Sequence, residues 1–316
     1  MDCPICEYPR AEPGYQMRDR FFQTTADQFS LNHCPSCGLW FQDEEGLADR
    51  LDSFYPSGYW WDGGGSLSSL EQRYRESMVR WDQLRFVMSG FKETKGRRLL
   101  DIGCGNATFV KEALGAGFDA FGLETSAEAR AIADEEVPGR VFNTTVDDLI
   151  AAGEKFEVLT LFHSLEHMLQ PYRYLRKLHR LVERPGTVFV QVPNSQSLQA
   201  RLLGSRWYGF DCPRHIYNFS SFSLMHMLGK AGYRIHEVRQ FSLRDNAASL
   251  VSSLFPSLDP MSQRVKKLRK TGKSSSQGLN VKQFLYFNLM VMAQPLAWFE
   301  AKLGRGATVM LRATLD

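Results

Sequence analysis

The stretch LLDIGCGNATFV, residues Leu99–Val110, decides the fold. An apolar run ends at Asp101, a turn with two glycines follows at Gly103–Gly105, and a helical pattern begins after it. This order is typical of the first strand, loop and helix of an α/β unit whose loop lets the backbone approach a bound nucleotide. A dinucleotide-binding loop has a third Gly or Ala where this chain has Thr108. The stretch therefore predicts a nucleotide-type ligand but argues against a dinucleotide.

Composition bounds the class of protein. The chain has 316 residues, of which 43% are hydrophobic and 23% charged, enough to bury one sizeable core and a smaller module. The net charge of +3 does not indicate a surface dedicated to nucleic acid. Because Met1 runs directly into cysteine-rich sequence without an apolar stretch, we expect no signal peptide and predict a cytoplasmic location.

Four of the six cysteines form two Cys-x-x-Cys knuckles. Cys3 and Cys6 form the first knuckle, and Cys34 and Cys37 form the second. Each can place two thiolates on one side of a tight turn, so the pair predicts a closed tetrahedral Zn²⁺ site. In a reducing compartment, metal ligation is favoured over disulfides. Because a closed site has no open position for chemistry, we expect this zinc to stabilise a small ribbon.

From residue 97 onward, short apolar runs alternate with helical patterns. The expected strands are 98–102, 118–123, 156–162 and 187–192, with a sixth at 234–241 and a last, antiparallel one at 306–315. The expected helices between them are 107–116, 126–134 and 172–183. This alternation predicts a parallel sheet covered on both faces. Ligands bind such sheets at the carboxyl ends of the strands.

Acidic residues at those strand ends indicate which ligand is bound. Glu124 follows the second strand, where an acid can bind two ribose hydroxyls, and Asp147 lies where an acid can bind an adenine amino group. Together with a glycine loop that needs no pyrophosphate, these describe S-adenosylmethionine. Asp101 can then orient the ammonium of its amino-acid tail. An ordinary dinucleotide-binding domain is the alternative.

In these segments the chain resembles the class I S-adenosylmethionine-dependent methyltransferases, in particular the branch with an amino-terminal zinc ribbon. The resemblance is carried, in order, by CPSCGLWF, LLDIGCGNATFV, FGLETS, FHSLEHMLQP, PGTVFVQVPN and PRHIYNFSSFSLMHMLGKAGY. It implies a Rossmann-like, seven-stranded α/β sheet with a small amino-terminal zinc ribbon. By that likeness, the residues that contact the cofactor are Asp101, Gly103, Cys104, Gly105, Glu124, Asp147, Phe162 and His163.

The segment His163-Ser-Leu-Glu166-His167 also matches the inverted zinc-protease pattern, which requires a long helix. Here a strand-like run ends at His163, and Pro171 follows closely. This context argues against a hydrolase. The resemblance implies instead that the segment closes over the cofactor, with Glu166 and His167 fixing the loop by hydrogen bonds.

A later loop, Asp211–Tyr217, is expected to lie over the methyl group of the cofactor. His215 is the candidate catalytic base there, because imidazole titrates near neutral pH and can take a proton from the acceptor. The alternative is that His215 only bonds backbone or caps a helix. Arg214 and Arg206 are expected to clamp a phosphate or carboxylate of the acceptor.

The acceptor class is argued from the end of the fourth strand. Methyltransferases of exocyclic base nitrogens usually have an Asn/Asp-Pro-Pro-aromatic segment there, whereas residues 162–165 are Phe-His-Ser-Leu. Nucleic acid is therefore not favoured. The resemblance implies a small-molecule or sugar-type acceptor, such as a nucleotide sugar or glycan. An RNA methyltransferase with a zinc module and a non-catalytic cofactor-binding module remain the alternatives.

An aromatic segment and a helix are expected between the ribbon and the glycine loop. The aromatic residues are Tyr55, Tyr59, Trp60 and Trp61, and a glycine triplet follows them. They predict either a mobile cover over the ligand or packing between ribbon and core. An amphipathic helix with one buried stripe is predicted from Leu67, Leu70, Tyr74, Met78, Trp81, Leu84 and Met88.

The carboxy-terminal part contains a basic and apolar insertion at about 255–303. A basic stretch precedes the apolar run 281–299, which contains too many polar residues and a proline to span a membrane. A packed lid, a homodimer contact and a peripheral membrane contact through 264–299, at the inner face of the membrane, stay open. The predicted organisation is a zinc ribbon over 1–45, a linker and helix over 46–95, and the methyltransferase domain over 96–316.

Overall fold

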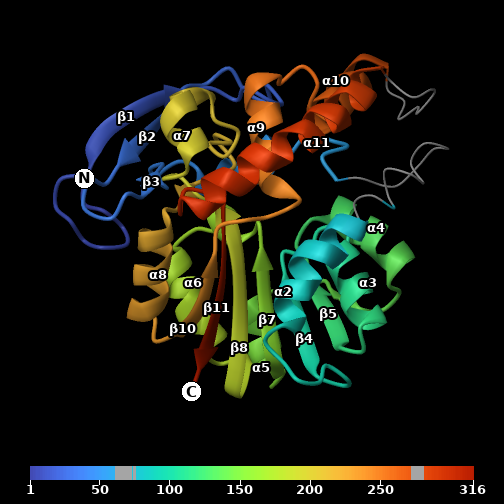
Figure 1. The fold of residues 1–316 in the computed structure, drawn as a ribbon. Helices are drawn as coiled ribbons and strands as arrows, with labels where there is room; N and C mark the ends of the chain where they lie inside the picture. The colour runs from blue at the N-terminus through green and yellow to red at the C-terminus, as the bar shows by residue number, and fades with distance from the viewer. Residues whose placement is uncertain (61–72, 74–75, 272–280) are drawn as a thin grey trace.

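The structure is a computed structural model that describes residues 1–60, 73, 76–271 and 281–316. The glycine triplet, Trp61 and the first three residues of the predicted helical stripe, Leu67, Leu70 and Tyr74, lie outside the described residues. Figure 1 shows a helix-covered central sheet, with a small second sheet and a group of helices across one end of it.

The central sheet has seven strands in the order β10-β11-β8-β7-β4-β5-β6. The strands are β4 (Arg98–Ile102), β5 (Asp119–Leu123), β6 (Val141–Phe142), β7 (Phe156–Phe162), β8 (Val182–Pro193), β10 (Arg234–Arg239) and β11 (Thr308–Leu315). Strands β4 to β8 pair in parallel, and β11 is antiparallel to both β8 and β10. The prediction of a seven-stranded α/β sheet whose last strand is antiparallel is confirmed.

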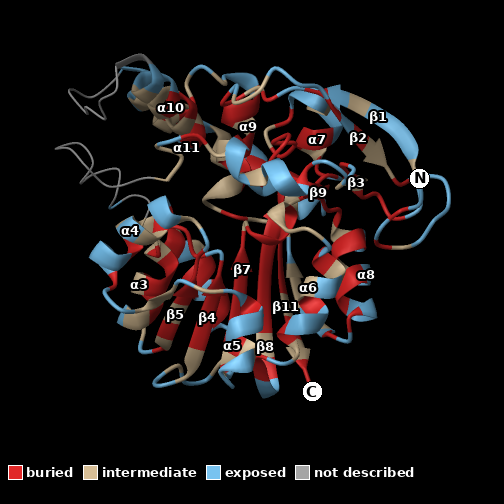
Figure 2. Ribbon diagram, turned by 180° about the vertical axis from the view of Figure 1, so that it is seen from behind, coloured by how far each residue is buried: buried red, intermediate tan, exposed pale blue. Residues whose placement is uncertain are grey.

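Helices cover both faces of this sheet, so its central strands are mostly buried, whereas the edge strands β10 and β6 are half-buried or exposed (Figure 2). The helices are α2 (Arg85–Met88), α3 (Thr108–Gly115), α4 (Ala127–Glu136), α5 (Val146–Ala151), α6 (Pro171–Leu178) and α8 (Ser221–Lys230). Leu99 packs in one cluster with residues of α2, α3 and α4, whereas its neighbour Leu100 packs in another with α5, α6 and α8. Successive side chains of a strand point to opposite faces, which explains the continuous apolar runs in the sequence.

The amino-terminal cysteine-containing segment is joined to the part of the chain with the central sheet by a second, shared sheet. Strands β1 (Glu12–Met17), β2 (Phe29–His33) and β3 (Trp40–Phe41) are completed by β9 (Tyr217–Asn218), which comes from the domain predicted over 96–316. Ser220 Oγ also donates a hydrogen bond of 2.7 Å to the Cys37 carbonyl. The 3-10 turn η1 (Ala48–Phe54) leads from this sheet to the aromatic segment.

The predicted amphipathic stripe is only partly correct in its described part, where Leu84 is buried as expected and Met78 is half-buried. Residues 76–79 are helical and continue into a π-helical turn, η2 (Arg80–Leu84), and then into α2. A π turn shifts the buried face because its hydrogen bonds reach one residue further than those of an α-helix. As a result Trp81 and Met88 are exposed, whereas Val79, Phe86 and Val87 are buried.

The predicted insertion lies across the carboxyl edge of the central sheet (Figure 1). It contains α10 (Pro260–Thr271) and α11 (Val281–Lys302). Helix α9 (Asp245–Leu254) directly precedes it, and α7 (Leu198–Leu203) with η4 (Gly204–Arg206) lies nearby. Helix α11 packs on α9 through Tyr286 and Met290, which contact Val251. None of the described helices is both long and apolar enough to cross a membrane.

Candidate active site

The glycine loop follows β4 and has no room for side chains at its two glycines. Gly103 and Gly105 have φ of +75° and +56°, in the region that favours glycine. A Cβ on Gly103 would lie 2.8 Å from the Ser164 Cβ, and one on Gly105 would lie 3.0 Å from a ring carbon of Trp60. The backbone of the loop is therefore tightly enclosed by neighbouring side chains, and Trp60 covers it from one side.

Asp101 lies at the carboxyl end of β4, directly before the loop, and is only 4% exposed. Thr160 Oγ1 donates a hydrogen bond of 2.6 Å to Asp101 Oδ1. Burial raises the pKa of Asp101 to about 7. The nearby Glu124 carboxylate also raises this pKa, whereas the hydrogen bond from Thr160 lowers it. A cation placed on the loop would favour the ionised form of this carboxyl group.

Glu124 follows β5 and is buried beside the same loop. Its Oε2 accepts a hydrogen bond of 3.0 Å from the Gly105 N–H, and its Oε1 accepts one of 2.7 Å from the Ser126 N–H. These bonds fix the carboxylate while each oxygen keeps a second lone pair for a ligand. The structure thus brings together the strand-end acids Asp101 and Glu124 and the glycine loop, as the sequence predicted.

Two of the predicted cofactor contacts are placed differently from the rest. Cys104 is buried, and its Sγ lies only 2.4 Å from the position of a Cβ on Gly122, so the thiol points into the sheet and only its backbone can face a ligand. Asp147 is exposed in the first turn of α5, where Lys177 Nζ binds its Oδ2 at 2.6 Å. Asp147 is not brought into the group around the loop, and its adenine role stays a prediction.

Phe162 and His163 end β7 beside the loop. The Phe162 ring packs edge-to-face on Phe109 of α3, with ring centroids 4.9 Å apart. His163 has a φ of +54°, and its Nε2 lies 2.8 Å from Asp245 Oδ2. Burial opposes its protonation, but the Asp245 and Glu166 carboxylates raise the pKa of His163 to about 9. His163 is therefore a cation at neutral pH and a poor proton acceptor.

The sequence analysis missed Asp245. This residue begins α9, far along the chain from His163, and its Oδ2 also accepts hydrogen bonds from Gln191 Nε2 at 2.5 Å and from Ser242 Oγ at 3.1 Å. Asp82, in η2, adds a second carboxylate whose pKa is raised to about 6 by burial and by Asp245. No local motif marks these acids, because only the packing of α9 and η2 against the end of β8 brings them together.

A second polar group lies where the loop 211–217 meets the segment after β7. Its histidines, His167 and His215, have ring centroids 4.6 Å apart. His167 Nδ1 lies 3.0 Å from the Arg214 carbonyl, and His215 Nδ1 lies 2.8 Å from the Gly209 carbonyl. A carbonyl can only accept, so both Nδ1 atoms carry the proton and both Nε2 atoms keep a lone pair while the rings are neutral.

Glu166 fixes the loop through its backbone, and its side chain does not take part. Its backbone carbonyl accepts from the Ile216 N–H, but neither oxygen of its buried carboxylate has a hydrogen-bond partner among the described residues. The His163 Nδ1 approaches to 3.5 Å. The ligand atoms of Glu166, His167 and His215 lie within 4.8 Å of one another, a spacing that could also hold a metal ion. Tyr55 completes the group through its hydroxyl, 3.0 Å from His167 Nδ1.

The predicted clamp at Arg214 is wrong. Its guanidinium is fully buried and binds Asp211 at 2.6 Å and Asp19 at 2.8 Å, and it also donates to the Phe54 carbonyl. The planar group needs these partners because an unpaired charge inside the protein is costly. Arg214 therefore ties the ribbon to the loop that carries His215, and it is not available to an acceptor.

The aromatic segment packs as a cover that is held by the insertion. Tyr55 contacts Tyr59, which contacts Trp60, with centroid distances of 5.0 and 5.2 Å. Arg264 of α10 donates hydrogen bonds to the carbonyls of Gly58 and Tyr59. The segment contacts the ribbon through the Tyr59 ring on Phe22 and lies against the glycine loop through Trp60, so the predicted packing between ribbon and core is present, whereas a mobile cover over the ligand stays a prediction.

The four ribbon cysteines have the spacing of a metal site. The distance from Cys3 Sγ to Cys37 Sγ is 3.7 Å, and that from Cys6 Sγ to Cys34 Sγ is 3.6 Å. Zinc–sulfur bonds of about 2.3 Å in a tetrahedron require sulfur atoms about 3.8 Å apart, so the donor set fits Zn²⁺. All four are free thiols, and all four sulfur atoms lie within 4.8 Å of one another.

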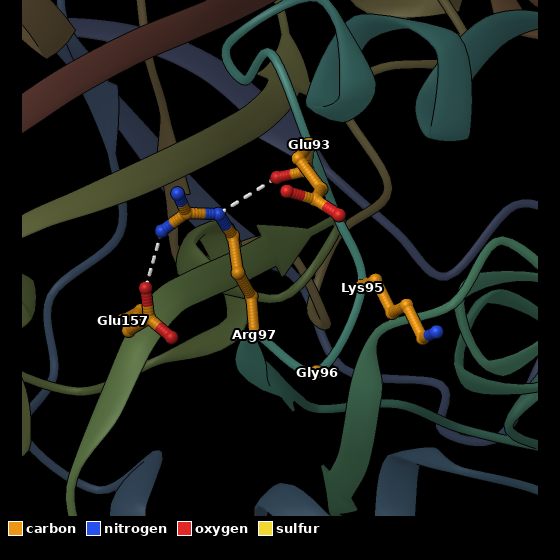
Figure 3. A pocket seen from close by; sticks show the side chains of 5 residues that line it. All are labelled: Glu93, Lys95, Gly96, Arg97 and Glu157. Atoms are coloured by element: carbon orange, nitrogen blue, oxygen red, sulfur yellow. Dashed lines mark hydrogen bonds and ion pairs between the residues drawn. The ribbon is translucent and has the colours of Figure 1, made fainter.

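A shallow pocket at the opposite end of the sheet does not compete with this site. Its lining includes Glu93, Arg97 and Glu157 (Figure 3). Arg97 already pairs with Glu157 and donates to the Glu93 carbonyl at 2.8 Å. Both Arg97 and Glu157 lie at the amino ends of strands, whereas ligands of parallel sheets bind at the carboxyl ends.

With this geometry in place, comparison with known proteins decides the family. A methyltransferase domain family matches residues 72–238, more than half of the chain. The chain belongs to the class I S-adenosylmethionine-dependent methyltransferases. The sequence segments around the glycine loop had predicted this family, and the match confirms it.

Individual relatives carry methyltransferase names. The chain is 31% identical over 150 residues to a ubiquinone biosynthesis O-methyltransferase of Cereibacter sphaeroides. The matched segment covers 44% of this chain and 60% of that protein. The chain is also 23% identical over 175 residues to the protein of the same name from Glaesserella parasuis. That match covers 52% of this chain and 72% of the relative. Among solved structures, it is similar to a methyltransferase of Archaeoglobus fulgidus, with 16% identity and a TM-score of 0.49, over 79% of this chain and 100% of that one.

Proposed function

We propose that this protein transfers the methyl group of S-adenosylmethionine to a small-molecule acceptor. The observation that carries the proposal is the arrangement of Asp101 and Glu124 around the tightly enclosed glycine loop, under Trp60. When it is bound, the cofactor supplies a methyl group already activated by its sulfonium. The residues of the chain then have to orient the cofactor, exclude water and move a proton.

Each residue of the loop region has a proposed task in cofactor binding. Asp101 holds the ammonium of the methionine part, and Glu124 accepts from the ribose hydroxyls. Gly103–Gly105 allow close approach of the backbone, and Trp60 excludes water from above. His163, fixed by its hydrogen bond to Asp245, lines the far side of the cofactor.

His215 is the proposed proton acceptor. Its Nδ1–H is engaged by the Gly209 carbonyl, so the lone pair of its Nε2 is left for a proton from the acceptor. The loop that carries His215 is fixed by Gln42, whose Nε2 donates to the His215 carbonyl at 2.7 Å. The ribbon thus positions the proposed base, which gives the zinc module a task in the active site.

We infer that the acceptor is a small molecule with a sugar or similar polar framework, such as a nucleotide sugar or glycan. The resemblance to zinc-ribbon methyltransferases supports a sugar-type acceptor. The relatives named for O-methylation in ubiquinone biosynthesis support a small molecule and favour oxygen as the atom that is methylated. The four cysteines are proposed to bind one Zn²⁺ that stabilises the ribbon.

The acceptor proposal is tested by supplying methyl-labelled S-adenosylmethionine to the protein together with a cell extract separated into sugar nucleotides, lipid-linked glycans, RNA and protein. We expect label in one of the first two fractions. Label confined to RNA would contradict the proposal and favour an RNA methyltransferase. Binding of S-adenosylmethionine without transfer to any fraction would favour a non-catalytic module.

A further inference from the structure

Helix α11 exposes an apolar surface that the described part of the chain leaves uncovered. Its buried side is the stripe that packs on α9, with Tyr286, Met290 and Ala297 at 5% exposure or less. The opposite side, which we call the α11 face, is interrupted by the exposed Asn288. Its exposed large hydrophobic residues are Val281, Phe284, Leu285, Val291, Met292, Leu296, Trp298, Phe299 and, just after the helix, Leu303, each between 46% and 78% exposed. A helix that is apolar on all sides normally has all sides covered.

The charge around this face is strongly positive. The described residues among 260–305 include eight lysines and arginines, and Glu300 is the single acid among them. Glu300 is buried and accepts a hydrogen bond from Gln199 at 2.7 Å, so it offers no charge to the surface. Lys266 on α10 and Lys302 at the end of α11 are exposed. Surfaces that bind anionic lipid headgroups combine basic residues with an apolar helix face that contains aromatic residues such as Trp298.

We propose that the α11 face, together with the exposed lysines Lys266 of α10 and Lys302 of α11, binds the surface of an anionic membrane. The charge favours this partner over a second copy of the chain, because two copies would bring their basic helices close together. The helix would lie in the interface, since no described helix is long and apolar enough to cross the bilayer.

The helices of the proposed membrane-binding surface are connected to the candidate active site in two ways. Helix α9, on which α11 packs, begins with Asp245, which binds His163. Helix α10 carries Arg264, which holds the backbone next to Trp60 over the glycine loop. Docking of α10 and α11 on a bilayer therefore places the cover of the cofactor loop next to the lipid. If the proposed methyl transfer is correct, this position suits an acceptor carried on a lipid.

The test is flotation of the full chain with phosphatidylcholine vesicles, with and without about a third phosphatidylglycerol, at low and at high salt. We expect the protein to float with the anionic vesicles at low salt and to bind at least about tenfold less to the neutral ones. Lys266→Glu and Lys302→Glu are each expected to lower the vesicle affinity about fivefold or more, the effect of one basic residue near an anionic surface.

Two variants distinguish binding through the α11 face from nonspecific hydrophobic binding to vesicles. Trp298→Ser combined with Phe299→Ser is expected to lower vesicle affinity about tenfold or more, because two interfacial aromatic anchors are lost. Phe222→Ser, which removes a similarly exposed ring from α8, is the matched control and should bind as the unmodified protein does. Unchanged melting temperatures and S-adenosylmethionine binding show that the variants fold.

Three results would overturn the proposal: no flotation, equal binding to neutral and anionic vesicles, or a dimer in solution that the Trp298 and Phe299 substitutions dissociate. The last result would assign the face to a second copy of the chain. Because flotation is measured without cofactor or acceptor, its failure is distinguishable from failure of the proposed methyl transfer.

Discussion

The pH dependence of cofactor binding tests the role of Asp101 most sharply. The free protein holds this carboxyl group with a pKa of about 7, because it is buried and lies near Glu124. Only the carboxylate attracts the ammonium of S-adenosylmethionine, so affinity is full above this pKa and is lost as the pH falls through it. A carboxyl group with this pKa is about one-tenth ionised at pH 6, so the affinity should be about tenfold lower there than on the high-pH plateau.

The assay is titration calorimetry of S-adenosylmethionine at a series of pH values with the unmodified protein and with Asp101→Asn. The amide can still bond Thr160 but has no charge, so the variant should bind about 1.5–3 kcal/mol more weakly and lose the pH dependence near neutrality. Asp119→Asn is the matched control, because Asp119 pairs with arginines at the amino end of β5. A flat profile for the unmodified protein, or an unchanged profile for Asp101→Asn, would refute the reasoning.

Three further predictions concern the other site residues. Glu124→Ala should weaken S-adenosylmethionine binding by about 2–3 kcal/mol, because a charged acceptor for the ribose is lost, and unchanged affinity in calorimetry would move the ribose contact elsewhere. Metal analysis should find one Zn²⁺ per chain in the purified protein. The Cys3→Ser variant should lose this Zn²⁺ and unfold the ribbon, while it keeps most of its cofactor binding. Metal-free protein with a folded ribbon would rule out the zinc site. His215→Ala should lower turnover by about 10²- to 10⁴-fold at unchanged cofactor affinity, whereas the exposed His226→Ala should have no effect. Near-normal turnover of the His215 variant on the true acceptor would end its assignment as the base, and turnover that depended on added Mg²⁺ would point to a metal at the histidine pair instead.

The alternation of strands and helices and the glycine loop could be predicted because they depend on local patterns. The buried run before Asp101 and the positive φ at Gly103 and Gly105 follow from side-chain periodicity and from the steric freedom of glycine. Glu124 could be placed beside the loop because the carboxyl ends of neighbouring parallel strands meet at one edge.

The remaining contacts depend on long-range packing that leaves no mark in a short segment. Arg214 looked available in the sequence, but its partner Asp19 lies in the ribbon, so its burial is visible only in the folded chain. Asp245 meets His163 only because α9 packs over the end of β7. The helical stripe failed at Trp81 because a π turn adds a residue to the repeat, and helical periodicity does not anticipate this change.

The most direct test of the account is an experimental structure of the protein with S-adenosylhomocysteine, the product of methyl transfer. We expect the ribose hydroxyls within hydrogen-bond distance of Glu124, the amino group of the tail directed to Asp101, and the backbone of Gly103–Gly105 against the ligand beneath Trp60. The sulfur, which marks the place of the transferred methyl group, should face the side of the loop that carries His215. A ligand bound away from the glycine loop, or one whose ribose makes no contact with Glu124, would contradict the account.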